Sequence, residues 1–227
     1  MAKSSAPGVS LTERAYAEVK ALILRGAIAP NAQIDEKMIA GRLGVSRTPV
    51  REALLRLKNE GLVEIERGRG IVVRALSSSD MHEIYQAITG MEVMAVFVLT
   101  ARGAERAALE PLYAALRRFD AAGRRADLEL WGKADEAFHR GLLLLCGNRH
   151  IEAAGLQFRD LAQRAHLVAM RLQPLEYLAR SAEMHRALVE LILAGDAEAA
   201  ASAHFQQRRR GAEMLVKAVE TFHLVAL

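Results

Sequence analysis

The stretch Gly44-Val-Ser-Arg-Thr-Pro-Val-Arg-Glu-Ala-Leu-Leu-Arg-Leu57 decides the fold of the N-terminal third of the chain. A glycine opens it, and Pro49 is tolerated in the first turn of a helix. Its apolar side chains recur at helical spacing and so share one face: Val50, Leu54 and Leu57. The stretch therefore predicts a short amphipathic helix that begins directly after a tight turn.

Two further helices are predicted before this stretch. Ser10-Leu-Thr-Glu13 has the spacing of a capping box, which marks the start of a helix. Asp35 can cap a second helix, which Gly44 would end. The apolar residues of that second helix are spaced for one face: Met38, Ile39 and Leu43. Two helices separated by a glycine turn indicate a helix-turn-helix.

A β-hairpin is predicted next. The β-rich segments 62–65 and 70–73 flank Glu66-Arg-Gly-Arg69, which is short, basic and contains glycine. A hairpin after a helix-turn-helix makes a winged helix-turn-helix. We therefore assign residues 10–76 to a winged helix-turn-helix domain and residues 1–9, which are small and polar, to a disordered tail.

The basic charge of the chain is concentrated in this first part. The whole chain has a net charge of +4. Residues 1–76 hold 13 Lys and Arg against 8 Asp and Glu, whereas the remainder holds 18 against 19. A basic domain beside a nearly neutral one favours a polyanionic partner for the first domain alone.

The predicted helix at 47–57 would read DNA. In a winged helix-turn-helix the second helix of the pair enters the major groove, where arginine can donate two hydrogen bonds to guanine. Arg47 and Arg51 lie four residues apart and so share a face. Other side chains are expected to contact DNA phosphates or to reach the DNA from the tip of the wing. The predicted DNA-binding residues are Lys37, Arg42, Arg47, Thr48, Arg51, Arg67, Gly68 and Arg69.

Residues 77–227 show a nearly continuous helical pattern of about six helices, with breaks near Gly103, Gly123, Gly147, Pro174 and Gly195. No strand pattern occurs in this part. The predicted fold class is therefore mainly α: a winged helix-turn-helix followed by an all-α bundle. A single cysteine, Cys146, excludes an intrachain disulfide. No signal-like or membrane-spanning run is evident, so we expect a cytoplasmic protein.

Two residues of the bundle are spaced as ligands of one metal ion. Asp135 and His139 lie at i and i+4 and share a helix face. His185 lies on another predicted helix, among apolar residues that indicate an inward orientation. Aspartate and histidine together can hold zinc, nickel or a similar divalent transition metal. The sequence therefore predicts a metal site in the bundle.

The chain resembles a known family in both parts. The run Gly44–Leu54, together with Glu60-Gly-Leu62 and Arg67-Gly-Arg-Gly70, resembles the DNA-binding domain of GntR-family regulators. Residues 78–220 more loosely resemble the FadR-type subgroup with its C-terminal effector-binding (FCD) domain. The segments that carry this second resemblance are Asp135–His139, Gly147-Asn148, Met184-His-Arg186 and Ala194-Gly-Asp196.

The resemblance implies a fourth metal ligand, a histidine on the last helix. That position is Gln207 here, and His204 lies one turn earlier. Three outcomes are open: a three-ligand site completed by water or effector, a site that recruits His204, or a pocket that binds its effector without metal.

The subgroup also places an arginine one turn before the position of Glu92, where this chain has Thr89. The other candidates for effector contact are Arg102, Trp131, Arg164 and Arg171. We expect the basic run Arg208–Arg210 to be solvated.

The sequence thus predicts a transcriptional regulator, expected to be a repressor, that binds palindromic double-stranded operator DNA as a homodimer. A small-molecule effector, by resemblance an organic acid, would control its operator affinity from the bundle. Two alternatives stay open: a metal-dependent enzyme that uses Asp135, His139 and His185, and an architectural DNA-binder without an effector. The enzyme alternative lacks the β-rich scaffold on which such sites usually sit.

Overall fold

A computed structural model describes residues 9–171 and 175–221, and the side chains of residues 9–163 and 179–214. Most of the tail expected at 1–9 therefore lies outside the described residues. The chain divides into two compact units, with the boundary between Leu76 and Ser77. Each unit is described by itself.

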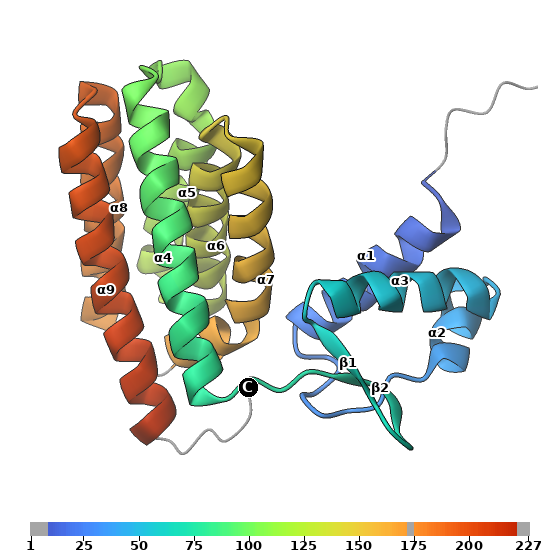
Figure 1. The fold of residues 1–227 in the computed structure, drawn as a ribbon. Coiled ribbons are helices and arrows are strands. Elements are labelled where there is room, and N and C mark those ends of the chain that lie inside the picture. The colour runs from blue at the N-terminus through green and yellow to red at the C-terminus, as the bar shows by residue number, and fades with distance from the viewer. Residues whose placement is uncertain (1–8, 172–174, 222–227) are drawn as a thin grey trace, which may run out of the picture. The chain divides into compact units, whose positions relative to one another are not determined.

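The first unit is a winged helix-turn-helix (Figure 1). Its elements are α1 (Leu11–Leu24), α2 (Glu36–Leu43), α3 (Arg47–Asn59), β1 (Val63–Glu66) and β2 (Gly70–Val73). The strands pair antiparallel, with Val63 opposite Val73 and Glu66 opposite Gly70. The buried stripe predicted for α3, Val50, Leu54 and Leu57, packs in the core of this unit.

The ends of these helices follow from local chemistry. The hydroxyl of Ser10 accepts a hydrogen bond from the backbone N–H of Glu13, as the capping box predicts. Asp35 caps α2 by accepting from the N–H groups of Lys37 and Met38. Gly44 ends α2 at a φ of +66°. A side chain with a Cβ is strained in that conformation, so the turn between α2 and α3 depends on glycine.

One prediction for α2 is wrong. Met38 was expected on the buried face but is 59% exposed. Ile39 and Ala40 are the buried residues of this helix. A helix of eight residues presents only a narrow face to its neighbours, which here includes Ile39 and Ala40 and leaves Met38 outside the contact.

The second unit is an all-α bundle, which confirms the predicted fold class. Its described elements are α4 (Ser78–Ala101), the short 3₁₀ turn η1 (Arg106–Leu109), α5 (Glu110–Arg125), α6 (Leu128–Leu145), α7 (Arg149–Arg171), α8 (Leu175–Ala194) and α9 (Ala197–Thr221). Helix α4 packs along α9 and also contacts α6 and α7 (Figure 1). It therefore forms the centre around which the site residues collect.

The bundle core is aliphatic and aromatic. Leu112, Phe119, Phe138 and Leu142 are among its fully or almost fully buried side chains. Helix α4 is long and apolar enough to cross a membrane by length and composition. Within the described residues, 44% of its most apolar stretch is buried in the bundle.

Gly41 within α2 and Gly44 directly after it provide a matched stability test. Gly44→Ala should lower the free energy of unfolding of the first unit by about 1 kcal/mol, because alanine is strained at positive φ. Gly41→Ala should raise it by up to about 1 kcal/mol, because Gly41 is helical and a Cβ there meets open space. Urea denaturation of the full chain, followed by circular dichroism, measures both. Equal effects of the two substitutions would contradict this account of the turn.

Candidate metal centre and DNA-reading face

The structure brings the three predicted ligands together. Asp135 and His139 project from α6, and His185 projects from α8. The Nε2 atoms of His139 and His185 lie 3.3 Å apart. Oδ1 of Asp135 lies 3.6 Å from Nε2 of His139 and 3.7 Å from Nε2 of His185. All three side chains are buried.

The outward nitrogens of both histidines already have acceptors. Nδ1 of His139 faces the carboxylate of Glu92 at 2.8 Å, and Nδ1 of His185 faces the backbone carbonyl of Ser181 at 2.7 Å. These contacts favour the tautomer with the proton on Nδ1, which leaves the lone pair on Nε2. Both lone pairs then point toward each other and toward the Asp135 carboxylate.

This arrangement fits a divalent transition metal. Tetrahedral zinc with bonds of about 2.0–2.1 Å separates its ligand atoms by about 3.4 Å. The three measured separations, 3.3, 3.6 and 3.7 Å, are close to that spacing. When both imidazoles are neutral in this tautomer, three lone pairs converge and repel one another, and either a proton on His139 or a cation between the three groups relieves the repulsion. The carboxylate and carbonyl behind the imidazoles also match the usual outer contacts of metal-bound histidine.

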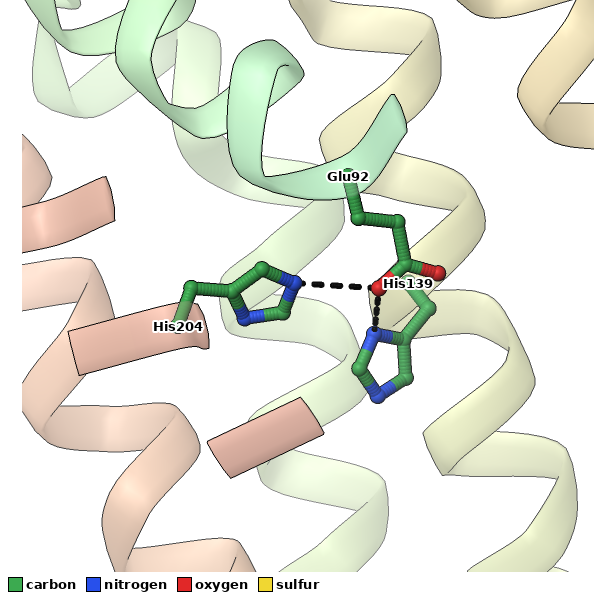
Figure 2. A group of neighbouring side chains, drawn as sticks. All are labelled: Glu92, His139 and His204. Carbon is green, nitrogen blue, oxygen red and sulfur yellow. Dashed lines mark hydrogen bonds and ion pairs between the residues drawn. The ribbon is translucent and has the colours of Figure 1, made fainter. Parts of the chain in front are cut away.

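A second group of side chains lies around Glu92 of α4. Figure 2 shows the imidazoles of His139 and His204 directed at one oxygen of Glu92, with Nδ1 of His139 at 2.8 Å and Nε2 of His204 at 3.0 Å. Arg159 of α7 donates to the other oxygen at 2.6 Å. Nε of Arg208 lies 3.4 Å from the carboxylate as an ion pair. This fully buried carboxylate therefore joins α4, α6, α7 and α9.

The possible ligand atoms of Glu92, His139 and His204 also lie close enough together to hold a metal ion. Arg159 and Arg208 already neutralise this carboxylate, and a cation here would be repelled by both guanidinium groups. Oδ1 of Asp135 instead lies 3.6 Å from Nε2 of His139 and 3.7 Å from Nε2 of His185. The group of Asp135, His139 and His185 is therefore the better cation site.

The pKa shifts of Glu92, His139 and His185 show how charge is distributed between the two groups of side chains. Burial raises the pKa of Glu92, but Arg208, His139 and Arg159 outweigh it and hold that pKa well below its ordinary value. Burial lowers the pKa of His139, but Glu92 and Asp135 outweigh it and raise that pKa. Burial and the neighbouring His139 lower the pKa of His185 to about 3. The neighbouring carboxylates thus favour a positive charge at His139, which a proton or a metal ion can supply, and His185 stays neutral.

The last helix contributes His204 and Gln207 as buried neighbours rather than as members of the three-ligand group. His204 contacts Glu92 through Nε2, and its ring centre lies 5.6 Å from that of His139. Among the described side chains, Nδ1 of His204 and Nε2 of Gln207 are buried without a hydrogen-bond partner. Nε2 of His204 faces the Glu92 carboxylate and so carries the ring proton, which leaves Nδ1 as an unpaired acceptor, whereas Nε2 of Gln207 is an unpaired donor.

Two arginines of the site were not predicted. Arg159 donates to Glu92 and, at 2.5 Å, to Glu136, which in turn contacts Arg140. Arg208 was expected to be solvated but is only 6% exposed, with its guanidinium over the ring of Tyr85. The Nε atoms of Arg159 and Arg208 are buried without a hydrogen-bond partner. A cavity of about 10 Å³, the size of one water molecule, lies between these arginines.

The structure places the proposed effector residues away from this cavity or outside the described part. Thr89 donates to the backbone carbonyl of Tyr85 and lines a groove between α4 and α9. Arg102 donates to the carbonyl of Cys146 at the end of α6. Trp131 packs on Phe119, 4.9 Å between ring centres. The side chains of Arg164 and Arg171 lie outside the described residues.

Phe119 connects Trp131 to the metal group. Its ring is stacked on that of His185, with the ring centres 5.0 Å apart. Phe138 meets the same imidazole edge-on at 4.4 Å. Two aromatic rings therefore restrain the orientation of His185, and Trp131 packs on one of them, Phe119.

The predicted DNA-binding residues lie on the surface of the first unit. Arg47, Thr48 and Arg51 line a hollow of about 510 Å³ on α3, together with Glu36, Glu52 and Leu55. Lys37 is exposed on α2, and Arg67 and Gly68 are exposed at the turn of the wing. Two predicted phosphate contacts already have acidic partners in this structure: Arg42 pairs with Glu18, and Arg69 pairs with Glu66.

Comparison with known proteins matches both units to family models. Residues 11–73 match the model "Bacterial regulatory proteins, gntR family", and residues 83–207 match the FCD domain. The chain therefore belongs to the GntR family of bacterial transcriptional regulators, with an FCD domain behind the DNA-binding domain. Regulators of this kind bind DNA and respond to effectors, and they are not enzymes, which sets the enzyme alternative aside.

Individual proteins that are similar to this chain are also transcriptional regulators by name or share its fold. An HTH-type regulator from the TAR-I ttuE-ttuC' intergenic region of Agrobacterium vitis is 36% identical over 63% of this chain and 85% of its own. The HTH-type transcriptional repressor GlaR of Escherichia coli is 29% identical over 80% and 84%. The structure of E. coli McbR/YncC covers 93% of this chain and 99% of its own with a TM-score of 0.79 at 22% identity, which shows the shared fold.

The buried carboxylate at position 92 is expected to dominate the stability of the bundle. Glu92→Gln should lower the free energy of unfolding by about 3–5 kcal/mol, because it removes a buried negative charge that faces both Arg159 and Arg208, of which Arg159 keeps its ion pair with Glu136. Asp120→Asn, which removes the exposed partner of Arg186, should cost less than about 1 kcal/mol. Thermal and urea denaturation with a chelator present keep metal binding out of the comparison. A loss in Glu92→Gln as small as that in Asp120→Asn would contradict the role of Glu92.

Proposed function

We propose that the protein is a cytoplasmic repressor whose affinity for a palindromic operator is controlled by an organic anion bound beside a divalent metal in the FCD domain. The observation that carries the proposal is the convergence of Asp135, His139 and His185 next to two buried arginines, Arg159 and Arg208. The relative GlaR is named a repressor, which supports that direction of control.

The metal and the arginines have complementary roles in this proposal. Asp135, His139 and His185 would hold zinc or nickel, which supplies an electrophilic centre for a carboxylate or hydroxyl oxygen of the ligand. Arg159 and Arg208 would pair with a second anionic group. Because Arg208 now lies against Glu92 beside a cavity of only about 10 Å³, effector entry requires that this side chain move. Gln207 offers a further donor to the ligand through Nε2, and His204 offers an acceptor through Nδ1.

Metal and effector binding are testable on the same set of variants. Protein purified without a tag or chelator should contain about one zinc or nickel per chain by elemental mass spectrometry. Asp135→Ala and His139→Ala should lose it, because two ligands cannot retain the ion. His150→Ala, which removes an exposed histidine, should keep it. Full occupancy in Asp135→Ala would contradict the assigned site.

A panel of small mono- and dicarboxylic acids then tests effector binding. At least one acid should raise the melting temperature of the metal-loaded protein, because a ligand of the folded state stabilises it. It should also change affinity for operator DNA. An absence of any shift across the panel would instead favour the architectural alternative, in which the bundle has no effector.

Homodimer formation is the second part of the proposal. Each winged helix reads few base pairs, so two copies on a palindrome double the contacts. The α4–α9 groove supports this pairing: it has a volume of about 940 Å³ and is lined by Val93 of α4 and Phe205 of α9, among others. Phe205 is 44% exposed, and Met94 and Phe97 of α4 are exposed as well. Exposed aromatic side chains beside a groove favour burial against another chain.

The charges of this face fit a second copy. Arg209 and Glu213 both line the groove and form an ion pair 3.8 Å long within α9. A face that carries both signs can meet its own two-fold copy without like-charge repulsion. We therefore assign the α4–α9 groove to the pairing of two chains.

Phe205→Glu should convert the dimer to monomer and weaken operator binding strongly, because it places a charge in the apolar centre of the pairing face. Phe205 is exposed in the single chain, so folding should be kept. Sedimentation velocity measures the assembly, and circular dichroism checks the fold. Leu144→Glu, an exposed apolar residue at the end of α6, is the matched control. A dimeric Phe205→Glu protein, or a monomeric parent, would contradict the proposed face.

A further inference from the structure

Two acidic side chains lie among the arginines of the DNA-reading face. Glu36 and Glu52 line the same hollow as Arg47 and Arg51. A carboxylate on a surface that approaches phosphates weakens binding by charge repulsion, so its position there needs a compensating role. The contacts of the two differ: Glu52 accepts a hydrogen bond from the hydroxyl of Thr12, whereas Glu36 faces Arg47.

Glu36 holds the side chain of Arg47. Oε2 of Glu36 lies 3.6 Å from Nη2 of Arg47. Glu36 is the first residue of α2 and Arg47 the first of α3, so the pair bridges the turn at Gly44. The Arg47 side chain is 71% exposed and that of Glu36 only 21%. A half-buried carboxylate on one helix thus restrains a long, solvated arginine at the start of the next.

We propose that Glu36 is a specificity-determining residue, which positions Arg47 for a guanine edge at the cost of non-specific affinity for DNA. This inference rests on the proposed role of Arg47 in base reading. Free arginine loses side-chain entropy when it forms two parallel hydrogen bonds, and an arginine already restrained loses less. The negative charge of Glu36 meanwhile opposes contact with phosphates of any sequence. Both effects raise the ratio of specific to non-specific binding.

The ion pair between Glu36 and Arg47 differs in its expected role from a second ion pair of the same domain, between Glu18 and Arg42. Glu18 lies 3.0 Å from Arg42, a side chain predicted to contact phosphate. Removal of the Glu18 charge should strengthen binding to every sequence alike. Glu18→Gln therefore serves as a control for charge alone.

The experiment uses the full-length protein and the duplex that the parent selects from a randomised pool, with a scrambled duplex of equal length for comparison. Fluorescence anisotropy at several salt concentrations gives the affinity for each. Glu36→Gln should lower the ratio of the two affinities roughly tenfold, part of the discrimination that one bidentate arginine provides. The scrambled duplex should bind the variant more tightly than it binds the parent. Glu18→Gln should leave the ratio unchanged.

A double-mutant cycle separates positioning from charge. In the Arg47→Ala background, which itself should lose discrimination, Glu36→Gln should cause no further loss of the ratio. An unchanged ratio in Glu36→Gln, an equal loss in Glu18→Gln, or independent losses from Glu36 and Arg47 would overturn the inference. If Arg47→Ala retains the parent ratio, the assignment of α3 as the reading helix is overturned as well.

Discussion

The carboxylate of Glu92 is the contact on which the arrangement of the bundle depends. It is fully buried and accepts hydrogen bonds or ion pairs from His139, His204, Arg159 and Arg208. Removal of a carboxylate from water costs several kcal/mol, and only several close donors offset that cost. Because those donors come from α6, α7 and α9, the requirement for satisfied partners fixes these helices against α4. The same contact sets the tautomer of His139, so the metal group depends on it too.

Local signals in the sequence were sufficient to predict the first unit. Ser10 and Asp35 cap their helices as predicted, and Gly44 adopts the positive φ that ends α2. The buried stripe of α3 follows directly from helical spacing. These features depend on residues close in sequence, so a pattern can show them. Met38 is the exception, because which side chains of an eight-residue helix become buried is decided by the neighbouring helices and not by its own period.

The site in the bundle could be predicted only in part, for a physical reason. The i, i+4 spacing of Asp135 and His139 identifies a shared face within one helix, and His185 was assigned from its apolar neighbours. Glu92 and Arg159 become part of the site only when α4 and α7 pack together. Arg208 lies in a run of three arginines that look alike in sequence. Successive helical residues point about 100° apart, so one arginine of the run turns inward while Arg209 and Arg210 stay exposed.

The buried charges also indicate how the bundle could transmit a signal under the proposed function. Glu92 forms ion pairs with Arg159 and Arg208, so a divalent metal bound at Asp135 would add positive charge beside this set, and an anionic ligand would offset it. An anion that engages Arg208 competes with Glu92 for it. Arg208 lies over the ring of Tyr85, and Tyr85 lines both the small inner cavity and the α4–α9 groove. Under the proposed function, displacement of Arg208 would therefore be felt in the groove through one aromatic side chain, Tyr85.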